Sequence, residues 1–526
     1  MDRSIQAGCL LLLALGFSGS VAAHAFGQRY ELPVPLWLYL VGAAATVVLS
    51  FVVMAFFVRE PAAKVTKRRY NLLNLVLFRL LAHRYSLALL RLLSVALFVL
   101  VLLTGFYGFP VTQYNFAPAF VWVIWWVGFA YISALVGDLW ALLNPWKIIF
   151  NWAAGVHRWF FPGRCLGTGW SYPKWLGVFP AIALFMAFAW LEHAYPDNAE
   201  PEVVAAAALT YGGITWIGML LFGGDRWLKN GEIFTVLFSL FARFSPTEMR
   251  VKQGALCTDC SQSANQTEGT SVGCPACFSQ AKPELRELNL RPLASGLVSD
   301  QPLSSSMVVL VMLLLSTLAL DGFLETPLAA SLFDGWNSAG SLKPLLAALG
   351  AQGGGEVVVF VTLALLIAPV LFVTVYLSFS WLMQRTVSRG SQTKQYSVWY
   401  LARLFALSLL PIAIAYHLAH YLSFLLLQGQ SIIALASDPF GLDWDLFGTA
   451  YHRINIGIVD ARFSWYTAVI AIVSGHVIAV YLAHRAAVAA FSDSRQAIRS
   501  QYPMLGLMVG YTMLSLWILA QPIVGF

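Results

Sequence analysis

The chain has 526 residues, of which 59% are hydrophobic and only 11% are charged. Soluble domains carry about 25% charged residues, so this composition excludes a soluble globular protein and indicates an integral membrane protein. The net charge of +7 does not require a nucleic-acid partner, because Lys and Arg gather in alternate loops between apolar runs. We therefore expect the lipid bilayer as the main partner and no nucleic acid.

The amino terminus has the charged, apolar and small-residue regions of a secretory signal peptide, residues 1–23. Its apolar part, 5–17, is short for a membrane span. Cleavage after Ala23 would make His24 the mature amino terminus, where the free amine and the imidazole can chelate one metal ion. A retained anchor, or a cut after Ala25, is the alternative.

Ten apolar runs follow, each long enough to cross about 30 Å of hydrocarbon. We therefore expect an all-α polytopic membrane protein with about ten transmembrane helices. They form a first half, 24–244, and a second half, 304–526, of about five helices each. The expected spans lie near 36–58, 88–108, 119–143, 175–194, 203–223, 305–321, 355–383, 397–427, 463–485 and 503–523.

The loop charges predict the orientation. The strongest basic cluster lies between the first and second spans, from Arg59 to Arg84, and the positive-inside rule places it in the cytoplasm. Segment 196–202 has no basic residue, and segment 428–462 holds four aspartates, so both are expected outside. The prediction is a multi-pass protein of the bacterial inner membrane, with a periplasmic amino terminus after signal cleavage.

Residues 245–303 differ from the rest because they are polar and rich in turn-forming residues. They contain Cys257-x-x-Cys260 and Cys274-x-x-Cys277, two pairs that can place four thiolates on one ion in the tetrahedral arrangement zinc prefers. Disulfides are disfavoured in the reducing cytoplasm. We expect a zinc-ribbon-like insertion with a structural zinc, with iron as the alternative metal, because four sulfur ligands leave no position for a substrate.

Histidines inside the apolar spans are the strongest functional signal, because imidazoles in hydrocarbon are costly unless they pair, bind a metal or line a wet cavity. His417 and His420 lie one helical turn apart and share a face of the eighth span. His476 in the ninth span is expected at about the depth of His417, where the two helices could present imidazoles to each other. His484, nearer the inner boundary, is expected to reach the interface.

Other polar residues are expected to converge in the outer half of the membrane. These are Glu192 and His193 at the end of the fourth span and Asp321 near the end of the sixth. Asp138 lies nearer the inner side, where we expect it to cap, pair or kink a helix. Cys165 is expected to be a plain thiol.

Three imidazoles on one divalent ion leave a position for water, whose pKa then falls toward 7. We therefore predict a membrane or periplasmic metal site, with zinc or copper held by a subset of His417, His420, His476, His193 and His24. Asp321 or Glu192 would orient a histidine or accept a proton. The simpler interpretation is that these polar groups only hold helices together.

The sequence also resembles bacterial membrane proteins of the fenitrothion hydrolase family, an organophosphate hydrolase family. The stretches that carry the resemblance are Ala23–Leu38, Gly137–Trp140, Asn144–Trp146, Asp438–Gly441, Trp444–Gly448, Trp465–Tyr466, Gly475–Val477 and Leu482–His484. The resemblance covers most of the chain and implies a hydrolase of apolar, phosphotriester-like esters, which agrees with the metal site predicted from the histidines. It assigns no catalytic residues.

Three other functions remain open. His417 and His476 could be axial ligands of a haem in an electron carrier. The outer histidines with His24 could bind copper for import or sensing. A cavity lined by these groups could transport a solute, and any of these functions could require a related membrane subunit.

Overall fold

A computed structural model describes residues 34–57, 69–252, 271–273, 278, 281–298, 301–338, 355–388, 396–491 and 493–522. Within these residues, ten helical segments are long and apolar enough to cross a membrane, so the expected all-α polytopic membrane protein is confirmed. Each of the ten corresponds to one predicted span. The signal peptide, 1–23, and His24 lie outside the described residues.

Seven of the ten spans consist of one helix each, and three contain more than one helical element. The single helices are α2 (Leu36–Phe57), α4 (Arg84–Tyr107), α10 (Pro201–Phe222), α14 (Ser305–Leu324), α17 (Gly355–Ser388), α21 (Ala461–Ala490) and α22 (Ser494–Leu519). The composite spans join α5 (Phe116–Pro118), η4 (Ala119–Gly128) and α6 (Phe129–Leu135); η5 (Lys174–Leu176) and α9 (Phe179–His193); and α18 (Val398–Phe405), η10 (Ala406–Leu409) and α19 (Leu410–Gln428).

Shorter elements connect the spans. The helices are α3 (Val76–Leu81), α7 (Trp140–Leu143), α8 (Pro145–Phe160), α11 (Gly224–Asn230), α12 (Ile233–Ala242), α15 (Pro327–Ser338) and α20 (Ser431–Ser437). The strands are β1 (Tyr70–Asn71), β2 (Thr247–Val251), β3 (Ser271–Val272) and β4 (Arg286–Leu290). The 3₁₀ turns are Leu72–Asn74, Thr112–Tyr114, Pro283–Leu285, Ser295–Leu297 and Ile456–Ile458.

Two predicted spans have the wrong bounds. The third was expected over 119–143 but ends at Leu135, because Gly137 has φ +153° and the chain turns there. The tenth was expected to begin at 503 but begins at Ser494, whose preceding residue Asp493 caps the helix by accepting a hydrogen bond from the Arg495 N–H, 3.1 Å away. The first turns of this helix are polar, so hydropathy alone does not reveal where it begins.

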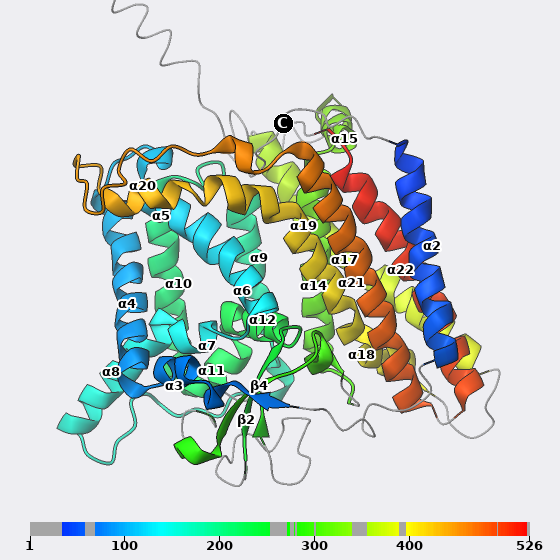
Figure 1. Ribbon diagram of the computed structural model, residues 1–526, viewed down its shortest axis with the longest axis horizontal. Helices are drawn as coiled ribbons and strands as arrows, with labels where there is room; N and C mark the ends of the chain where they lie inside the picture. Colours follow the sequence, from blue (N-terminus) through cyan, green and yellow to red (C-terminus); the bar gives the residue numbers. More distant parts are fainter. Residues whose placement is uncertain are drawn as a thin grey trace, which may run out of the picture.

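Helices α14 and α19 form the centre of the bundle. Of the residues in the most apolar stretch of each span, 78% are buried in the sixth and in the eighth, against 11% in α4. Helices α4, α9, α10 and α12 lie on one side of this pair, and α17, α21, α22 and α2 lie on the other (Figure 1). Side chains of α14 and α19 are therefore shielded from lipid by other helices.

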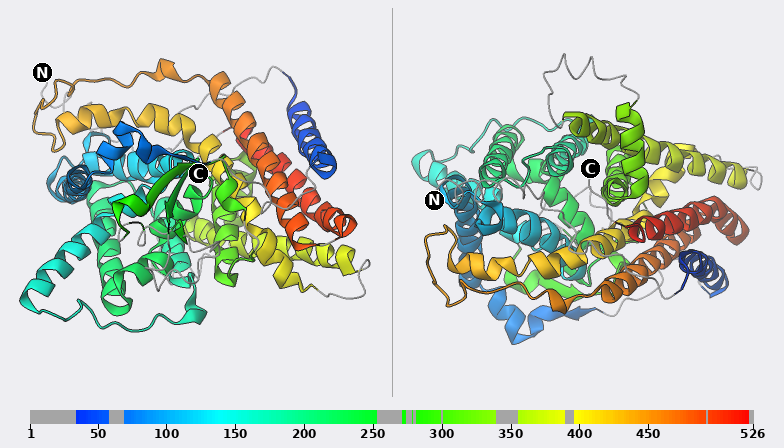
Figure 2. Two further views of the ribbon diagram at one scale, coloured as in Figure 1. Left: turned by 60° about the horizontal axis from the view of Figure 1, so that its bottom comes forward. Right: turned by 90° about the horizontal axis from the view of Figure 1, so that it is seen from above.

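The first span packs against the last two and not against the second. Helix α2 contacts α21 and α22 at one edge of the bundle, whereas α4 stands at the opposite edge (Figures 1 and 2). Val47 and Phe51, on the inner face of α2, are buried in this contact. The chain therefore crosses the whole bundle between its first two spans.

A four-stranded antiparallel sheet lies at one end of the bundle, which we call the sheet side (Figure 1). Its order is β1-β4-β2-β3, so the loop after the first span contributes a strand to the sheet of the segment predicted as a zinc-ribbon-like insertion. Arg69 Nε lies 3.2 Å from Glu248 Oε2, and Arg291 Nη1 lies 3.4 Å from Glu248 Oε1. The Arg69–Glu248 pair joins the two loops, and the Arg291–Glu248 pair lies within the second. We call the opposite end of the bundle the far side.

The short helix α12 is an element that the hydropathy pattern did not single out. Eight of its ten residues are buried. Its N-cap Glu232 is also buried, and it accepts hydrogen bonds from the N–H groups of Phe234 and Thr235, from Asn144 Nδ2 at 3.2 Å and from Tyr211 Oη at 2.5 Å. Burial raises the pKa of Glu232, although the hydrogen bonds oppose that effect. This carboxyl group joins the beginnings of α8 and α12 to α10.

Candidate functional site

Polar residues from three helices meet near the far side of the bundle. Glu192 and His193 are the last two residues of α9, Asp321 lies one turn before the end of α14, and His420 and Tyr421 lie in α19. We call these five residues the acid–histidine cluster. Their position places titratable groups against the buried centre of the bundle.

Asp321 is the common partner in the cluster. Its Oδ2 lies 2.9 Å from His420 Nε2 and accepts a hydrogen bond from Tyr421 Oη at 2.5 Å. Its Oδ1 lies 3.5 Å from His193 Nδ1. One carboxylate thus contacts two imidazoles and a phenol, which come from two different helices.

The cluster continues outward through His193. The second ring nitrogen of this residue, Nε2, lies 3.7 Å from Glu192 Oε2. Carboxyl and imidazole groups therefore alternate in the order Glu192, His193, Asp321, His420. The series places proton donors and acceptors next to one another, although the 3.5 and 3.7 Å contacts of His193 are longer than direct hydrogen bonds.

The surroundings of Glu192 fix the outer end of this series. Trp126 Nε1 donates to Glu192 Oε1 at 2.8 Å, and Asn198 Nδ2 donates to the Glu192 backbone oxygen at 2.5 Å. The side chain of Glu192 is 16% exposed, whereas that of His420 is 3% exposed. The cluster thus extends from a partly accessible carboxyl group to a buried imidazole.

A glycine makes room for the cluster at the contact of α14 and α19. A Cβ atom at Gly322 would collide with Tyr416 Oη, would lie 2.8 Å from Ile518 Cγ2 and would lie 3.6 Å from His420 Cε1. The Tyr416 ring stacks on His420, with centroids 5.9 Å apart. Gly322, beside Asp321 in sequence, therefore lets both side chains of α19 approach α14.

His417 lies next to the cluster but does not contact its carboxyl groups directly. Its ring is surrounded by Trp126, Tyr131, Phe241 and Tyr421, with centroids 4.8 to 6.3 Å away. It is 2% exposed, and its Nε2 has no hydrogen-bond partner among the described residues. This histidine sits in an aromatic enclosure that includes Tyr421 of the cluster and Trp126, which donates to Glu192.

The expected meeting of His476 with His417 is wrong. Nδ1 of His476 lies 2.8 Å from the Ile472 oxygen of its own helix, its ring contacts Tyr511 of α22, and no contact with another histidine is found in the described part of the chain. The reason lies in the contact of α19 and α21, where a Cβ at Gly475 would be 2.8 Å from the Pro411 oxygen. Gly475 faces α19, and the next residue, His476, is turned away.

His484 was expected to reach the interface, and this is also wrong. It is 2% exposed, and its Nδ1 lies 3.1 Å from Gln501 Oε1 of α22. Asp138 behaves as a cap, because its Oδ1 accepts a hydrogen bond from the Ala141 N–H at 3.1 Å. Cys165 is free and exposed. None of these residues belongs to the cluster.

In the described part of the chain, no group of three or more His, Cys, Asp or Glu side chains is arranged around a common point that could hold a metal ion. Cys257, Cys260, Cys274 and Cys277 lie outside the described residues. The strands beside them are described, and Val251 of β2 pairs with Ser271 of β3.

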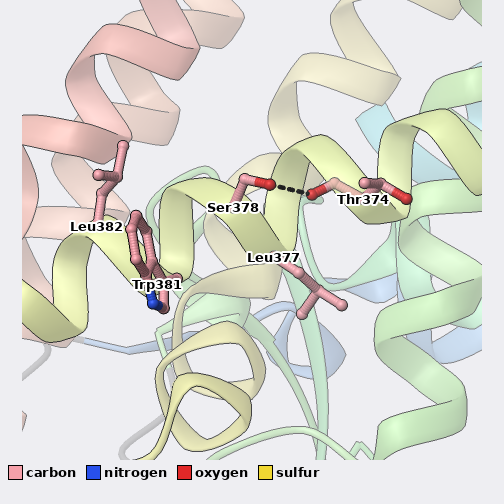
Figure 3. A pocket seen from close by; sticks show the side chains of 5 residues that line it. All are labelled: Thr374, Leu377, Ser378, Trp381 and Leu382. Carbon is pink, nitrogen blue, oxygen red and sulfur yellow. Dashed lines mark hydrogen bonds between the residues drawn. The ribbon is translucent and has the colours of Figure 1, made fainter.

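A hollow on α17 is lined by Thr374, Leu377, Ser378, Trp381 and Leu382, all from one helix (Figure 3). Ser378 Oγ donates to the Thr374 oxygen at 2.8 Å, and the Arg385 guanidinium stacks on the Trp381 ring at 3.8 Å. The lining offers no acid or base, so the acid–histidine cluster is the better candidate for chemistry.

Sequence reasoning found four members of the cluster and missed the role of two aromatic residues. Tyr421 stood in the sequence directly after His420, but its hydrogen bond to Asp321 depends on how α14 and α19 pack. Trp126 gave no signal, because its span contains several tryptophans. Comparison of the chain with protein-family models, with curated proteins and with solved structures finds no match.

Proposed function

We propose that the protein is a membrane-embedded hydrolase of apolar, phosphotriester-like esters, and that the acid–histidine cluster is its reaction centre. The observation that supports this most directly is the contact of Asp321 with His420 and His193. A carboxylate orients an imidazole and stabilises its protonated form, which is what general-base catalysis requires. The resemblance to fenitrothion hydrolases supports the substrate class.

The proposed reaction moves one proton through the cluster. A water molecule attacks phosphorus while an imidazole of the cluster accepts its proton. The bond between phosphorus and the leaving oxygen then breaks, and the imidazole returns the proton to that oxygen. Asp321 stabilises the imidazolium in between, and Tyr421 holds Asp321 in place. An uncharged substrate of this kind can arrive from the bilayer.

A divalent metal ion is part of the proposal. Two imidazoles and two carboxylates are the mixed nitrogen and oxygen donors that zinc accepts, and a bound ion would lower the pKa of a water ligand toward 7. His193, Asp321 and His420 would hold it, and Glu192 would then accept the proton of the attacking water, because both imidazoles of the cluster would be bound to the ion. These donors contact one another in the structure, so binding requires them to exchange their mutual contacts for the ion.

The test uses purified protein in nanodiscs and a neutral nitrophenyl phosphotriester, whose nitrophenolate product is coloured. Asp321→Asn, His420→Ala and His193→Ala should each lower kcat by about 100-fold or more. His452→Ala, at an exposed histidine in a loop, is the matched control and should retain full activity. Wild-type rates in the Asp321 and His420 variants, with unchanged thermal unfolding, would remove the proposed centre.

We further propose a structural zinc on Cys257, Cys260, Cys274 and Cys277. Four thiolates suit zinc, and the strands beside these cysteines are joined in one sheet. Cys257→Ser should remove about one equivalent of zinc while hydrolysis continues. Metal analysis of Cys257→Ser and of His420→Ala separates the two sites. Each variant should lose the metal ion of its own site and keep the ion of the other site. Zinc or copper at the second site is identified by the same measurement.

The orientation is also a proposal. Basic residues gather in the loops of the sheet side, so the positive-inside rule places that side in the cytoplasm of a bacterium and the cluster toward the periplasm. Labelling of exposed Cys165 by a membrane-impermeant reagent tests this. The reagent should react in inverted inner-membrane vesicles and fail in intact spheroplasts.

A second candidate is proton-coupled transport. The observation that favours it is the alternation of carboxyl and imidazole groups from partly exposed Glu192 to buried His420, because such series serve as proton relays in pumps and transporters. It predicts acidification of protein-containing liposomes when a solute gradient is applied, without ester turnover. Turnover without proton flux would exclude it.

A further inference from the structure

We infer that residues 151–175 form an arm that lies in the headgroup region of the sheet-side leaflet and binds anionic phospholipids. We call this segment the aromatic arm. It comprises the last turns of α8 and the chain that leads to α9. Helix α8 projects beyond the bundle at the sheet side (Figures 1 and 2). The inference does not depend on the proposed hydrolase function.

The arm exposes large aromatic side chains to an unusual degree. The exposed residues are Trp152 (45%), Trp159 (78%), Phe160 (63%), Phe161 (52%), Trp170 (59%) and Trp175 (78%). No other described part of the protein covers them. Tryptophan is the side chain most typical of the membrane–water interface, because its ring is apolar and its N–H still reaches water.

The helical part of the arm is two-faced. Trp152, Val156, Trp159 and Phe160 stand at positions i, i+4, i+7 and i+8, so they form one apolar stripe along α8, and all four are exposed. Arg158 lies on the opposite face. A helix with this distribution lies in the plane of the interface, with its apolar stripe in the lipid and its cation among the headgroups.

Charge selects the kind of lipid. Asp138 is the only acidic residue between Glu60 and Glu192 in the sequence, so the arm itself has none. Arg158, Arg164 and Lys174 are exposed, and no carboxylate pairs with them among the residues described. Their net positive charge is complementary to a headgroup with a net negative charge. Phosphatidylglycerol and cardiolipin share that chemistry, whereas phosphatidylcholine is neutral overall.

Alternative occupants fit the arm less well. A soluble protein partner would have to cover aromatic rings that are spread over residues 151–175. The exposed stripe is instead continuous with the lipid-facing surface of the neighbouring span α4, whose Leu89, Leu92 and Leu93 are also exposed. The bilayer already covers that surface, and the arm extends it along the membrane plane.

Cys165 provides a native position for the test, because it is exposed, free and within the arm. A spin label on Cys165 is measured in nanodiscs of phosphatidylcholine, with and without added phosphatidylglycerol, and the Cys165→Ser signal is subtracted to remove label on other cysteines. Added phosphatidylglycerol should make the label less accessible to a soluble nickel chelate and more accessible to oxygen, which dissolves in lipid.

The triple variant R158Q/R164Q/K174Q should lose this response. R453Q/R462Q, which removes two cations from the far side, is the matched control and should keep it. A label that is equally accessible to the nickel chelate in both lipids would overturn the proposal, and so would a response that survives in the triple variant. Spin–spin broadening that disappears when labelled protein is diluted with unlabelled protein would overturn it as well, because a second copy would then occupy the arm.

Discussion

His420 Nε2 lies 2.9 Å from Asp321 Oδ2, and this contact joins α19 to α14, the two central helices of the bundle. Tyr421, the next residue of α19, donates to the same oxygen atom. Consecutive side chains of one helix therefore hold one carboxylate of another. Because both helices are surrounded by protein, the carboxylate and the imidazole are held in place by packed elements and not by loops.

Tyr421→Phe removes the hydroxyl that donates to Asp321 while keeping the ring that packs against His417 and His420. We expect hydrolysis to slow by about 10- to 100-fold, which is typical for the loss of a group that orients a catalytic side chain. The steady-state rate in nanodiscs measures this. Tyr172→Phe removes a hydroxyl that donates to the Gly177 oxygen outside the cluster, and it should keep the wild-type rate.

Gly322→Ala should disturb the cluster by steric means alone. The added methyl group would collide with Tyr416 Oη and crowd Ile518 Cγ2, so we expect a loss of stability of about 1 to 3 kcal/mol together with lower activity. Gly510→Ala on α22 is the control, because a Cβ there meets nothing within 4 Å. Thermal unfolding of both variants, followed by turnover at a temperature where both are folded, provides the comparison. Equal melting temperatures of Gly322→Ala and Gly510→Ala would contradict the close packing at Gly322.

Glu232→Ala should be among the most destabilising single changes in the protein. It leaves the Phe234 and Thr235 N–H groups, Asn144 and Tyr211 without their common acceptor in a buried site. Each lost partner costs on the order of 1 kcal/mol or more, so we expect about 3 kcal/mol or more in total. Exposed Glu202, also near a helix start, serves as the control, and Glu202→Ala should cost less than about 1 kcal/mol. A small effect of Glu232→Ala on thermal unfolding would show that α12 is held in another way.

Asp138 should make stability depend on pH. Burial raises the pKa of Asp138 to about 6, against the opposing effects of the Ala141 N–H and the Lys147 charge. The folded protein therefore binds this proton more tightly than the unfolded chain does. The contribution of Asp138 to stability is complete below about pH 4 and is lost as the pH rises through about 6.

Asp138→Asn mimics the protonated form, so the variant should lack this part of the pH dependence and be at least as stable as wild type at pH 8. Melting curves between pH 4 and 8 measure the difference. Exposed Asp197 offers a comparison, and Asp197→Asn should follow the wild-type curve. A variant that is less stable than wild type at pH 8 would show that the fold requires the ionised carboxyl group, which is the opposite of the expected effect.

Much of the fold could be predicted from hydropathy, because crossing a bilayer demands long apolar helices and this demand is visible in single segments. The bounds failed where local chemistry overrides hydropathy, as at Gly137 and at the polar beginning of α22. The strand pairing of Tyr70 with Leu290 could not be foreseen. It joins residues far apart in sequence, and two-residue strands carry no periodic signal.

The candidate site was predicted in composition but not in geometry. Glu192, His193, Asp321 and His420 were singled out because charged or titratable groups are expensive in apolar spans. Which of the histidines meet depends on helix rotation. Gly475 on α21 and Gly322 on α14 help to set this rotation, because each lets its helix approach α19 closely on one face. A depth calculation predicts the height of His476 in the membrane but not the direction in which its ring points.

The packing of α2 against α21 and α22 has a consequence for biosynthesis. Of the described helices, the ribosome delivers α2 first and its two partners last, so α2 waits in the membrane without its final neighbours until translation is nearly complete. A chain truncated before α21 would leave α2 without its docking surface. Quality-control proteases that recognise unassembled helices could then distinguish full-length from truncated chains by the contact of α2 with α21 and α22.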